Sequence, residues 1–303
     1  MPAAVSHHLK LPAGWELVSS EGPGPFVTRA VVRRPDGRLV RWRSRSQRKR
    51  SAAMRRLAQG GTTHEPVWWR PRRVEWWMAV LFAVGSLCFA VGGFASQWQR
   101  SLHPAVGVVF FVGSLFFTSA AYLQYQEAVN AERGLQAGPA RKRWRPASWE
   151  PRRIDWLATL VQFLGTLLFN VSTFAAMKHG LTTHESNARV WAPDALGSIA
   201  FLVSSELAFA EVCHRWLGWR PKVAAWRIVA LNLAGSVFFG ISAVASLLEP
   251  STGEPLSAHI ANSGTALGGV CFLIGALALM PEAAAEEARA AAQQPDAAPA
   301  GSP

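Results

Sequence analysis

The sequence predicts an all-α protein: a polytopic membrane helix bundle of six spans, built from three tandem helical hairpins. Two observations predict this fold class. Six apolar stretches lie between Val74 and Met280, and each has the length of about 20 residues that a helix needs to cross a bilayer. A tryptophan-proline motif also precedes every second stretch in a fixed register, and such self-similarity is typical of proteins built from repeated units.

The repeated motif runs from one Trp to another and carries Pro at its third position, followed by basic residues. Its copies are Trp69–Trp76, Trp149–Trp156 and Trp219–Trp226. Proline suits the first turn of a helix, and Trp suits the headgroup layer of a membrane. We therefore predict that Pro71, Pro151 and Pro221 start the odd-numbered spans. The candidate lipid-headgroup contacts are Trp69, Arg72, Arg73, Trp149, Arg152, Arg153, Trp219 and Lys222. A selective lipid or partner site is the alternative to a simple interfacial anchor.

The spans themselves also repeat. Gly followed by Ser or Thr, and then Phe, recurs in register as Gly85-Ser86 with Phe89, Gly165-Thr166 with Phe169, and Gly235-Ser236 with Phe239. The second helices match more loosely, as Gly197–Ser204, Gly268–Gly275 and Phe110–Ser114. Small residues let helices approach closely in a membrane, so these columns predict helix packing. The expected spans are 74–96, 105–127, 154–177, 194–214, 225–248 and 260–280.

The N-terminal segment, residues 1–66, is basic and lies outside the membrane in this interpretation. Residues 26–32 and 38–42 alternate apolar and polar side chains around the turn sequence Pro35-Asp36-Gly37, which predicts a β-hairpin. A helix carrying seven Lys and Arg is expected over Arg43–Leu57. This helix is interpreted as a solvated juxtamembrane segment, with contact to anionic lipid as the alternative.

Loop charge predicts the orientation. Lys and Arg cluster before the first span, between the second and third, and between the fourth and fifth, whereas the alternate loops hold few. By the positive-inside rule, both termini lie in the cytoplasm and the protein is a multi-pass protein of the inner, cytoplasmic membrane. This distribution accounts for most of the formal net charge of +12, so no nucleic-acid partner is expected.

The chain divides accordingly into six parts. They are the basic cytoplasmic segment 1–66, membrane hairpin 67–130, a basic cytoplasmic linker 131–148, membrane hairpins 149–216 and 217–281, and a disordered tail rich in Ala, Pro and Glu, 282–303. The residues that follow Pro281 are expected to form a frayed helical extension before the disordered part.

Four polar residues fall within the spans: Gln162, Asn170, Glu206 and Asn232. Amides at this depth most often join helices by hydrogen bonds, although they can also line a transport path. Glu206 is the one ionisable side chain near the middle of a span, and an intramembrane carboxylate is a functional candidate by default. The corresponding position in the last hairpin is Leu277, which favours a structural role. Glu211 and His214 are expected near the interface.

No motif for a catalytic or cofactor site is present. The sequence lacks a P-loop, an H-E-x-x-H or G-x-S-x-G motif and a dinucleotide-binding glycine pattern. The histidines lack metal-ligand spacing, and the three cysteines form no C-x-x-C pair. We therefore expect no catalytic residue, no metal and no cofactor, and predict that the protein is not an enzyme.

At the first hairpin the chain resembles the YrhK-like family of bacterial membrane proteins. The resemblance rests on Pro71–Trp77 leading into Val84–Phe89, and on Phe111–Phe116. It covers the second hairpin less well and the third least, where Lys222-Val223 and Ala225 replace the Arg-Arg and acidic positions. The resemblance implies a compact helical membrane domain without an assigned reaction, and it supplies no catalytic residues.

Two functions remain open from the sequence, and a membrane-embedded lipid enzyme is a distant third because clustered acid–base groups are lacking. The first is a non-catalytic scaffold or accessory protein that contacts anionic lipid headgroups, a protein partner or a second copy of itself. The alternative is a transporter or channel for a small solute or ion, in which Glu206, Gln162 and Asn232 converge on one hydrated path. A scaffold predicts a closed, dry bundle instead.

Overall fold

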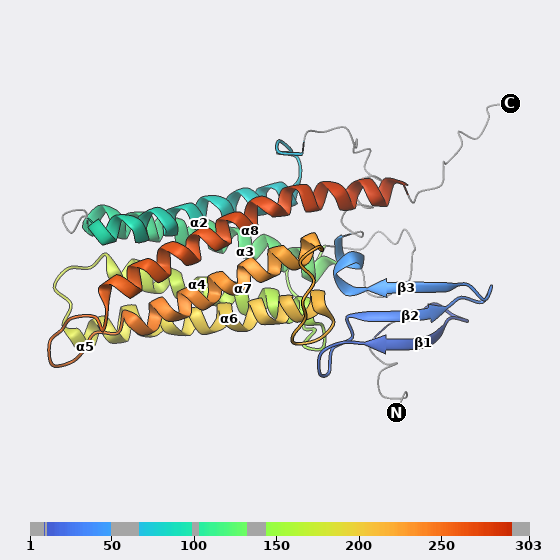
Figure 1. The fold of residues 1–303 in the computed structure, drawn as a ribbon, viewed down its shortest axis with the longest axis horizontal. Helices are drawn as coiled ribbons and strands as arrows, with labels where there is room; N and C mark the ends of the chain where they lie inside the picture. The colour runs from blue at the N-terminus through green and yellow to red at the C-terminus, as the bar shows by residue number, and fades with distance from the viewer. Residues whose placement is uncertain (1–8, 10, 50–66, 99–102, 132–143, 293–303) are drawn as a thin grey trace.

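The computed structural model describes residues 9, 11–49, 67–98, 103–131 and 144–292. A small antiparallel sheet lies at one end of a long helix bundle (Figure 1). The elements are β1 (Glu16–Glu21), β2 (Arg29–Arg33), β3 (Leu39–Arg43), α2 (Val74–Trp98), α3 (His103–Asn130), α4 (Ile154–Ala176), α5 (Thr183–Ser186), the π-helical turn η2 (Asn187–Trp191), α6 (Ala192–Cys213), α7 (Ala224–Ala245) and α8 (Ala258–Ala292).

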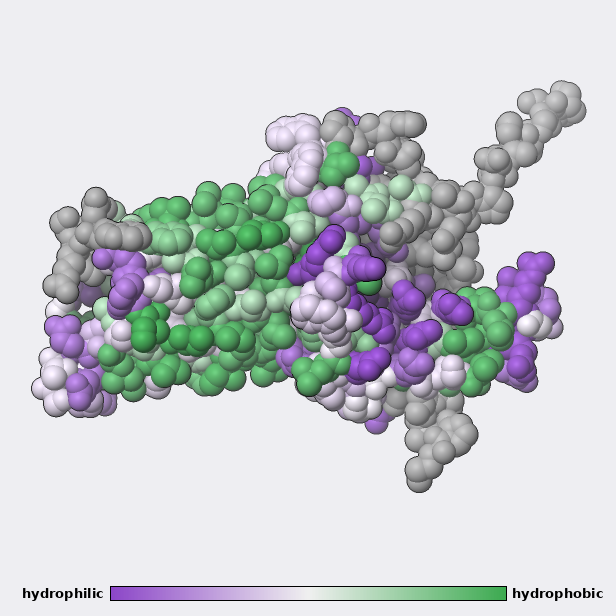
Figure 2. Space-filling model, in the orientation of Figure 1, coloured by the Kyte–Doolittle hydropathy of each residue, from purple (hydrophilic) through white to green (hydrophobic). Residues whose placement is uncertain are grey.

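The predicted fold class is confirmed, because six helices are long and apolar enough to cross a membrane. Figure 2 shows a hydrophobic band over the helices, with hydrophilic residues gathered near the sheet and at the opposite end of the bundle. This is the surface expected of a bundle whose middle faces lipid tails. The predicted span boundaries agree with the helices to within a few residues, except at the end of the last one.

The six long helices form a closed ring. Each packs against the long helix before it in the chain, and α8 packs against α2. Every helix sends one Phe to the centre, where the rings lie at centroid distances of 5.0–6.5 Å. These residues are Phe89, Phe117, Phe169, Phe201, Phe239 and Phe272. The Phe positions that recur in the sequence therefore form one aromatic core.

Glycines hold the two helices of each hairpin close together. A Cβ atom on Gly85 would lie 2.9 Å from the carbonyl oxygen of Gly113 on the neighbouring helix. The equivalent distances are 3.3 Å for Gly165 to Gly197 and 3.1 Å for Gly235 to Gly268. A side chain at any of these positions would push the helices apart, and close contact is the main source of helix association in a membrane.

The motif prolines are turn residues and not the first residues of the helices, which differs from the prediction. The N–H groups of Arg73, Arg153 and Val223 donate to the carbonyl oxygens three residues earlier, at 2.9–3.0 Å. Each Pro is thus the second residue of a β-turn, where its fixed φ is favoured. The helices begin three residues after each Pro, at Val74, Ile154 and Ala224.

The last helix extends beyond the predicted boundary. The structure continues α8 through Pro281 to Ala292. The helical extension expected after Pro281 is therefore present, and residues 282–292 are not part of a disordered tail. Proline removes one backbone hydrogen bond, but the Ala-rich sequence after it has high helix propensity. Residues 293–303 lie outside the described part.

The predicted β-hairpin is present as β2 and β3, paired from Arg29 with Arg43 to Arg33 with Leu39. Gly37 lies in its turn with φ of +80°, a conformation that favours glycine. The structure adds β1, which pairs with β2 and which the sequence did not predict because residues 16–21 alternate weakly. After β3, residues 44–49 are helical; the rest of the expected basic helix, residues 50–57, lies outside the described part.

Candidate functional site

A helical segment of the N-terminal region, residues 44–49, covers the end of the ring next to the sheet. We call this segment the basic arm and this end of the bundle the sheet end. Phe26, which precedes β2, packs among Ile154, Ala158, Leu207 and Ala210 of α4 and α6. This apolar contact attaches the sheet to the bundle and places the arm over the helix ends.

Arg48 is the centre of the ionic contacts made by the basic arm. Its guanidinium pairs with Asp155 at 3.2 Å, with Glu211 at 3.2 Å and with Glu127 at 3.9 Å. The three carboxylates come from α4, α6 and α3, and only 2% of the Glu211 side chain is exposed. Burial disfavours the charged guanidinium, but the three carboxylates outweigh that effect and raise the pKa of Arg48 above its ordinary value.

Two neighbours complete the network. The Ser44 hydroxyl donates to Glu211 Oε1 at 2.7 Å. Arg153 binds Asp155 from the other side, and it also donates to Glu150 at 2.8 Å and to the Ala128 carbonyl oxygen at 3.1 Å. Burial lowers the pKa of Arg153, yet Asp155 and Glu150 together raise it above its ordinary value. Buried charges require such partners, because an unpaired charge would be costly away from water.

The other two cations of the arm bind α8. Arg45 forms a two-pronged contact with Glu282, at 3.0 and 3.1 Å, and Lys49 binds the same carboxylate. All three cationic side chains are less than one-fifth exposed. The basic arm therefore connects α3, α4, α6 and α8 through charge pairs, with the hydrogen bond of Ser44 to Glu211 in addition.

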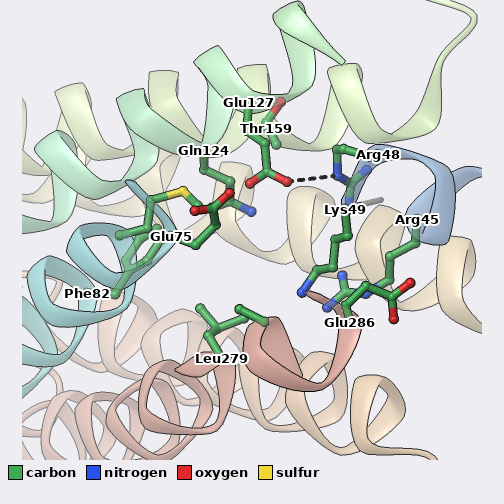
Figure 3. Close-up of a pocket in the computed structure, with 12 residues that line it drawn as sticks. Arg45, Arg48, Lys49, Glu75, Phe82, Gln124, Glu127, Thr159, Leu279 and Glu286 are labelled. Atoms are coloured by element: carbon green, nitrogen blue, oxygen red, sulfur yellow. Dashed lines mark ion pairs between the residues drawn. The ribbon is translucent and has the colours of Figure 1, made fainter. Parts of the chain in front are cut away.

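A cavity of about 80 Å³ lies beneath the arm (Figure 3). Figure 3 shows Arg45, Arg48 and Lys49 extending from the arm toward the cavity, with Glu75 and Gln124 on another side. The lining residues are Arg45, Arg48, Lys49, Glu75, Met78, Phe82, Gln124, Glu127, Thr159, Leu279, Ala283 and Glu286. The volume is enough for several water molecules, so this end of the ring can be hydrated.

The centre of the ring is filled. The space at the centre measures only about 10 Å³ and is bounded by five of the six Phe side chains, all but Phe272, with Ser114 and Thr166. That is at the lower limit for a single water molecule, and apolar spaces of this size stay dry. The hydroxyls of Ser114 and Thr166 donate to carbonyl oxygens of their own helices at 2.7 Å.

The candidate headgroup residues separate into two groups. Trp69, Trp149 and Trp219 are exposed, as are the first basic residues of the motif, Arg72, Arg152 and Lys222. The second basic residues face inward: Arg73 is 7% exposed, and Arg153 belongs to the ionic network. Asp155 accordingly pairs with Arg153 and Arg48.

The intramembrane polar candidates are distributed over several helix contacts. Asn170 accepts a hydrogen bond from Thr118 at 3.2 Å, between α4 and α3. The Asn232 side chain lies against Gly275 of α8. Gln162 and Glu206 are half-buried. Neither the cavity under the arm nor the space between the Phe rings is lined by Gln162, Glu206 or Asn232.

The sequence did not predict that the central residues of this site bind one another. Glu211 was expected at the interface and Glu282 in the tail, yet both bind the basic arm. The signal that was present is charge complementarity: a basic run precedes the first span, and acidic residues stand near the sheet end of α3, α4, α6 and α8. The pairing joins residues more than 75 positions apart, so no local pattern reports it.

The six long apolar helices among the described residues are those of a multi-pass integral membrane protein. Among the described residues, no group of three or more His, Cys, Asp or Glu side chains is arranged to hold a metal ion. No protein-family model, curated protein or solved structure matches the chain.

Proposed function

We propose that the chain is a non-catalytic scaffold or accessory protein of the cytoplasmic membrane. The observation that carries this proposal is the aromatic core, to which each of the six helices contributes one Phe. A ring filled at its centre presents surfaces to lipid and partners but offers little space for a solute to pass.

The proposed orientation places the sheet end in the cytoplasm. It is supported by the charge of the loops, because the loop segments at the sheet end carry most of the Lys and Arg. The same end holds the exposed basic residues of the motif. We also propose that the three hairpins are internal repeats, which their equivalent Gly contacts support. The resemblance to YrhK-like proteins stays a prediction.

The partner proposed first is anionic lipid at the sheet end. Arg72, Arg152 and Lys222 are exposed beside exposed Trp side chains, an arrangement that suits the headgroup layer. Arg45, Arg48 and Lys49 are excluded from this role because their charges are paired within the protein. A protein partner or a second copy of the chain can use the same face, and no nucleic acid is proposed.

Lipid retention tests the scaffold proposal. The purified protein is reconstituted in vesicles that contain phosphatidylglycerol and phosphatidylcholine, then re-extracted, and the retained lipids are quantified by mass spectrometry. We expect several-fold enrichment of phosphatidylglycerol, lost in the triple variant Arg72→Gln/Arg152→Gln/Lys222→Gln and kept in Arg38→Gln, an exposed arginine of the sheet. Equal retention by the triple variant and the native protein would refute the lipid role.

The second candidate is a gated transporter, and one observation favours it. Phe82 lines the cavity under the arm and also packs against Phe117 of the aromatic core, at a centroid distance of 5.2 Å, so the cavity reaches the edge of the core. Flux of potassium and of a small fluorescent anion through the same vesicles separates the two functions. The scaffold predicts flux equal to that of protein-free vesicles. A protein-dependent flux that Glu206→Gln abolishes would support the transporter.

A further inference from the structure

We propose that the basic arm is a releasable ionic strap, which closes the cavity at the sheet end while its cations are paired and uncovers it when they are not. The inference goes beyond the scaffold function, because it assigns a conformational device to residues 44–49. It rests on three observations: the arm lies over the helix ends, charge pairs connect it to them, and a cavity lies beneath it.

The arm is both the wall of the cavity and the partner of the helices around it. Arg45, Arg48 and Lys49 line the cavity, and the same side chains pair with carboxylates of four helices. Moving the arm away would remove this wall and leave an open groove. The remaining lining, such as Met78, Gln124 and Thr159, belongs to the helices and would stay in place.

The arm and the sheet are held by different forces. The sheet is attached through the apolar contact of Phe26 with α4 and α6, which salt does not weaken. The contacts that connect the arm to the helices include charge pairs and the hydrogen bond of Ser44. Neutralising Arg45 and Lys49 removes their charge pairs without changing the contact of Phe26. The arm can therefore leave while the sheet stays docked.

Ser44 is the residue about which the arm would move. The N–H of Ser44 donates to the Thr28 carbonyl oxygen at 3.0 Å, at the end of β3, so the first residue of the arm is part of the sheet. Release then means rotation about Ser44, with Arg48 and Lys49 moving furthest. The carboxylates left behind, Glu127, Asp155, Glu211 and Glu282, lie at the open end of the ring, where water can reach them.

Thiol accessibility tests this device in the full chain. Cys88, Cys213 and Cys271 are replaced by Ala, and Thr159→Cys, whose side chain lines the cavity, reports its accessibility to a water-soluble maleimide. The strap is weakened by Arg45→Gln/Lys49→Gln. This variant keeps Arg48, so Glu127, Asp155 and Glu211 keep their shared partner. We expect at least a tenfold faster labelling of Thr159→Cys in this variant, and slow labelling when the charges are kept by Arg45→Lys/Lys49→Arg.

Two further measurements keep the test decisive. Glu282→Gln removes the partner on α8 without changing the arm, and it must accelerate labelling in the same direction. Ser242→Cys, buried between α7 and α8 where its hydroxyl bonds to the Ala261 carbonyl oxygen, must label at an unchanged rate. Unchanged labelling of Thr159→Cys in the neutralised arm would overturn the proposal. A parallel rise at Ser242→Cys would also overturn it, because the whole bundle would then be loosened.

Discussion

Arg48 of the basic arm donates to both carboxylate oxygens of Glu211, which lies 163 residues further along the chain. The pair joins the N-terminal segment to α6, and Asp155 and Glu127 add α4 and α3 to the same guanidinium. One arginine thus contacts three carboxylates at the end of the ring, and Arg153 provides a second cation for Asp155. Four predictions follow from this network, the aromatic core, the close helix contacts and the docking of the sheet.

Removing the central cation should destabilise the protein strongly. Arg48→Met leaves Glu211, Asp155 and Glu127 without their shared partner, and breaking a buried ion pair from one side costs about 3–5 kcal/mol. The free energy of unfolding, measured by denaturant titration in detergent, should fall by that amount. Arg38→Gln, an exposed arginine of the sheet, should change it by no more than about 0.5 kcal/mol. Equal stability of the two variants would contradict the role of Arg48.

Truncating one ring of the aromatic core should also destabilise the bundle. Phe272→Ala removes contacts with Phe117, Phe201 and Phe239 at centroid distances of 5.5–5.7 Å, and such cavity-forming changes cost about 3–5 kcal/mol. The same titration measures the loss. Leu267→Ala, on the exposed face of the same helix, serves as the control and should have a small effect. If Leu267→Ala lowers the free energy of unfolding as much as Phe272→Ala does, the aromatic core is not the main source of stability of the ring.

A methyl group at a close helix contact should separate two helices. In Gly269→Ala the new Cβ would lie 2.6 Å from the backbone nitrogen of Ala90 on α2, which cannot move without shifting the helix. Overpacking of this kind costs about 1–3 kcal/mol. Gly107→Ala meets only Met177 Cγ at 3.4 Å, so we expect little change there. Thermal unfolding in detergent compares the two variants, and an equal melting temperature would count against the predicted contact.

Docking of the sheet should depend on pH through His214. Its Nδ1 lies 3.0 Å from the Thr28 hydroxyl. Burial, with Arg220, Arg43 and Arg29 nearby, lowers the pKa of His214 from 6.5 to about 4. Between these values the undocked state binds a proton that the docked state does not. Docking is therefore fully stable above about pH 6.5 and is weakened progressively as the pH falls to about 4.

Limited proteolysis of the N-terminal sheet measures this effect. Cleavage should be faster at pH 5 than at pH 7.5 in the native protein. His214→Asn should show a smaller pH difference, because Asn does not titrate and tolerates the left-handed backbone found here, with φ of +60°. Cleavage with the same pH dependence in both proteins would assign the effect to other groups.

Much of the fold was accessible to sequence reasoning because its signals are local. The lengths of the apolar stretches predicted α2, α3, α4, α6 and α7 closely, and the turn Pro35-Asp36-Gly37 predicted the β2–β3 hairpin. The motif prolines were placed one turn too far into the helices, since Pro suits both a β-turn and a helix start. Strand β1 was missed because its edge position and its polar residues, such as Ser19 and Ser20, leave little periodicity.

The candidate site was less predictable. Glu206 attracted attention as a carboxylate within a span, but the charges that form a network are Glu211, Asp155, Glu127 and Glu282 at the ends of the helices. The basic arm was interpreted as solvated or lipid-bound because a run of Lys and Arg carries no information about which carboxylates it meets. Only the tertiary structure shows that Arg45, Arg48 and Lys49 of the arm are paired with carboxylates of the helices.

The sequence by itself determined the number, length and approximate limits of the spans, because hydrophobic length and proline placement act within one segment. It also carried the recurring Phe positions without revealing their purpose. The tertiary structure decided that six helices close into a ring, that one Phe from each fills the centre, and that the basic arm binds the helix ends. Those outcomes depend on contacts between residues far apart in the chain, and these contacts become visible only when the helices are packed together.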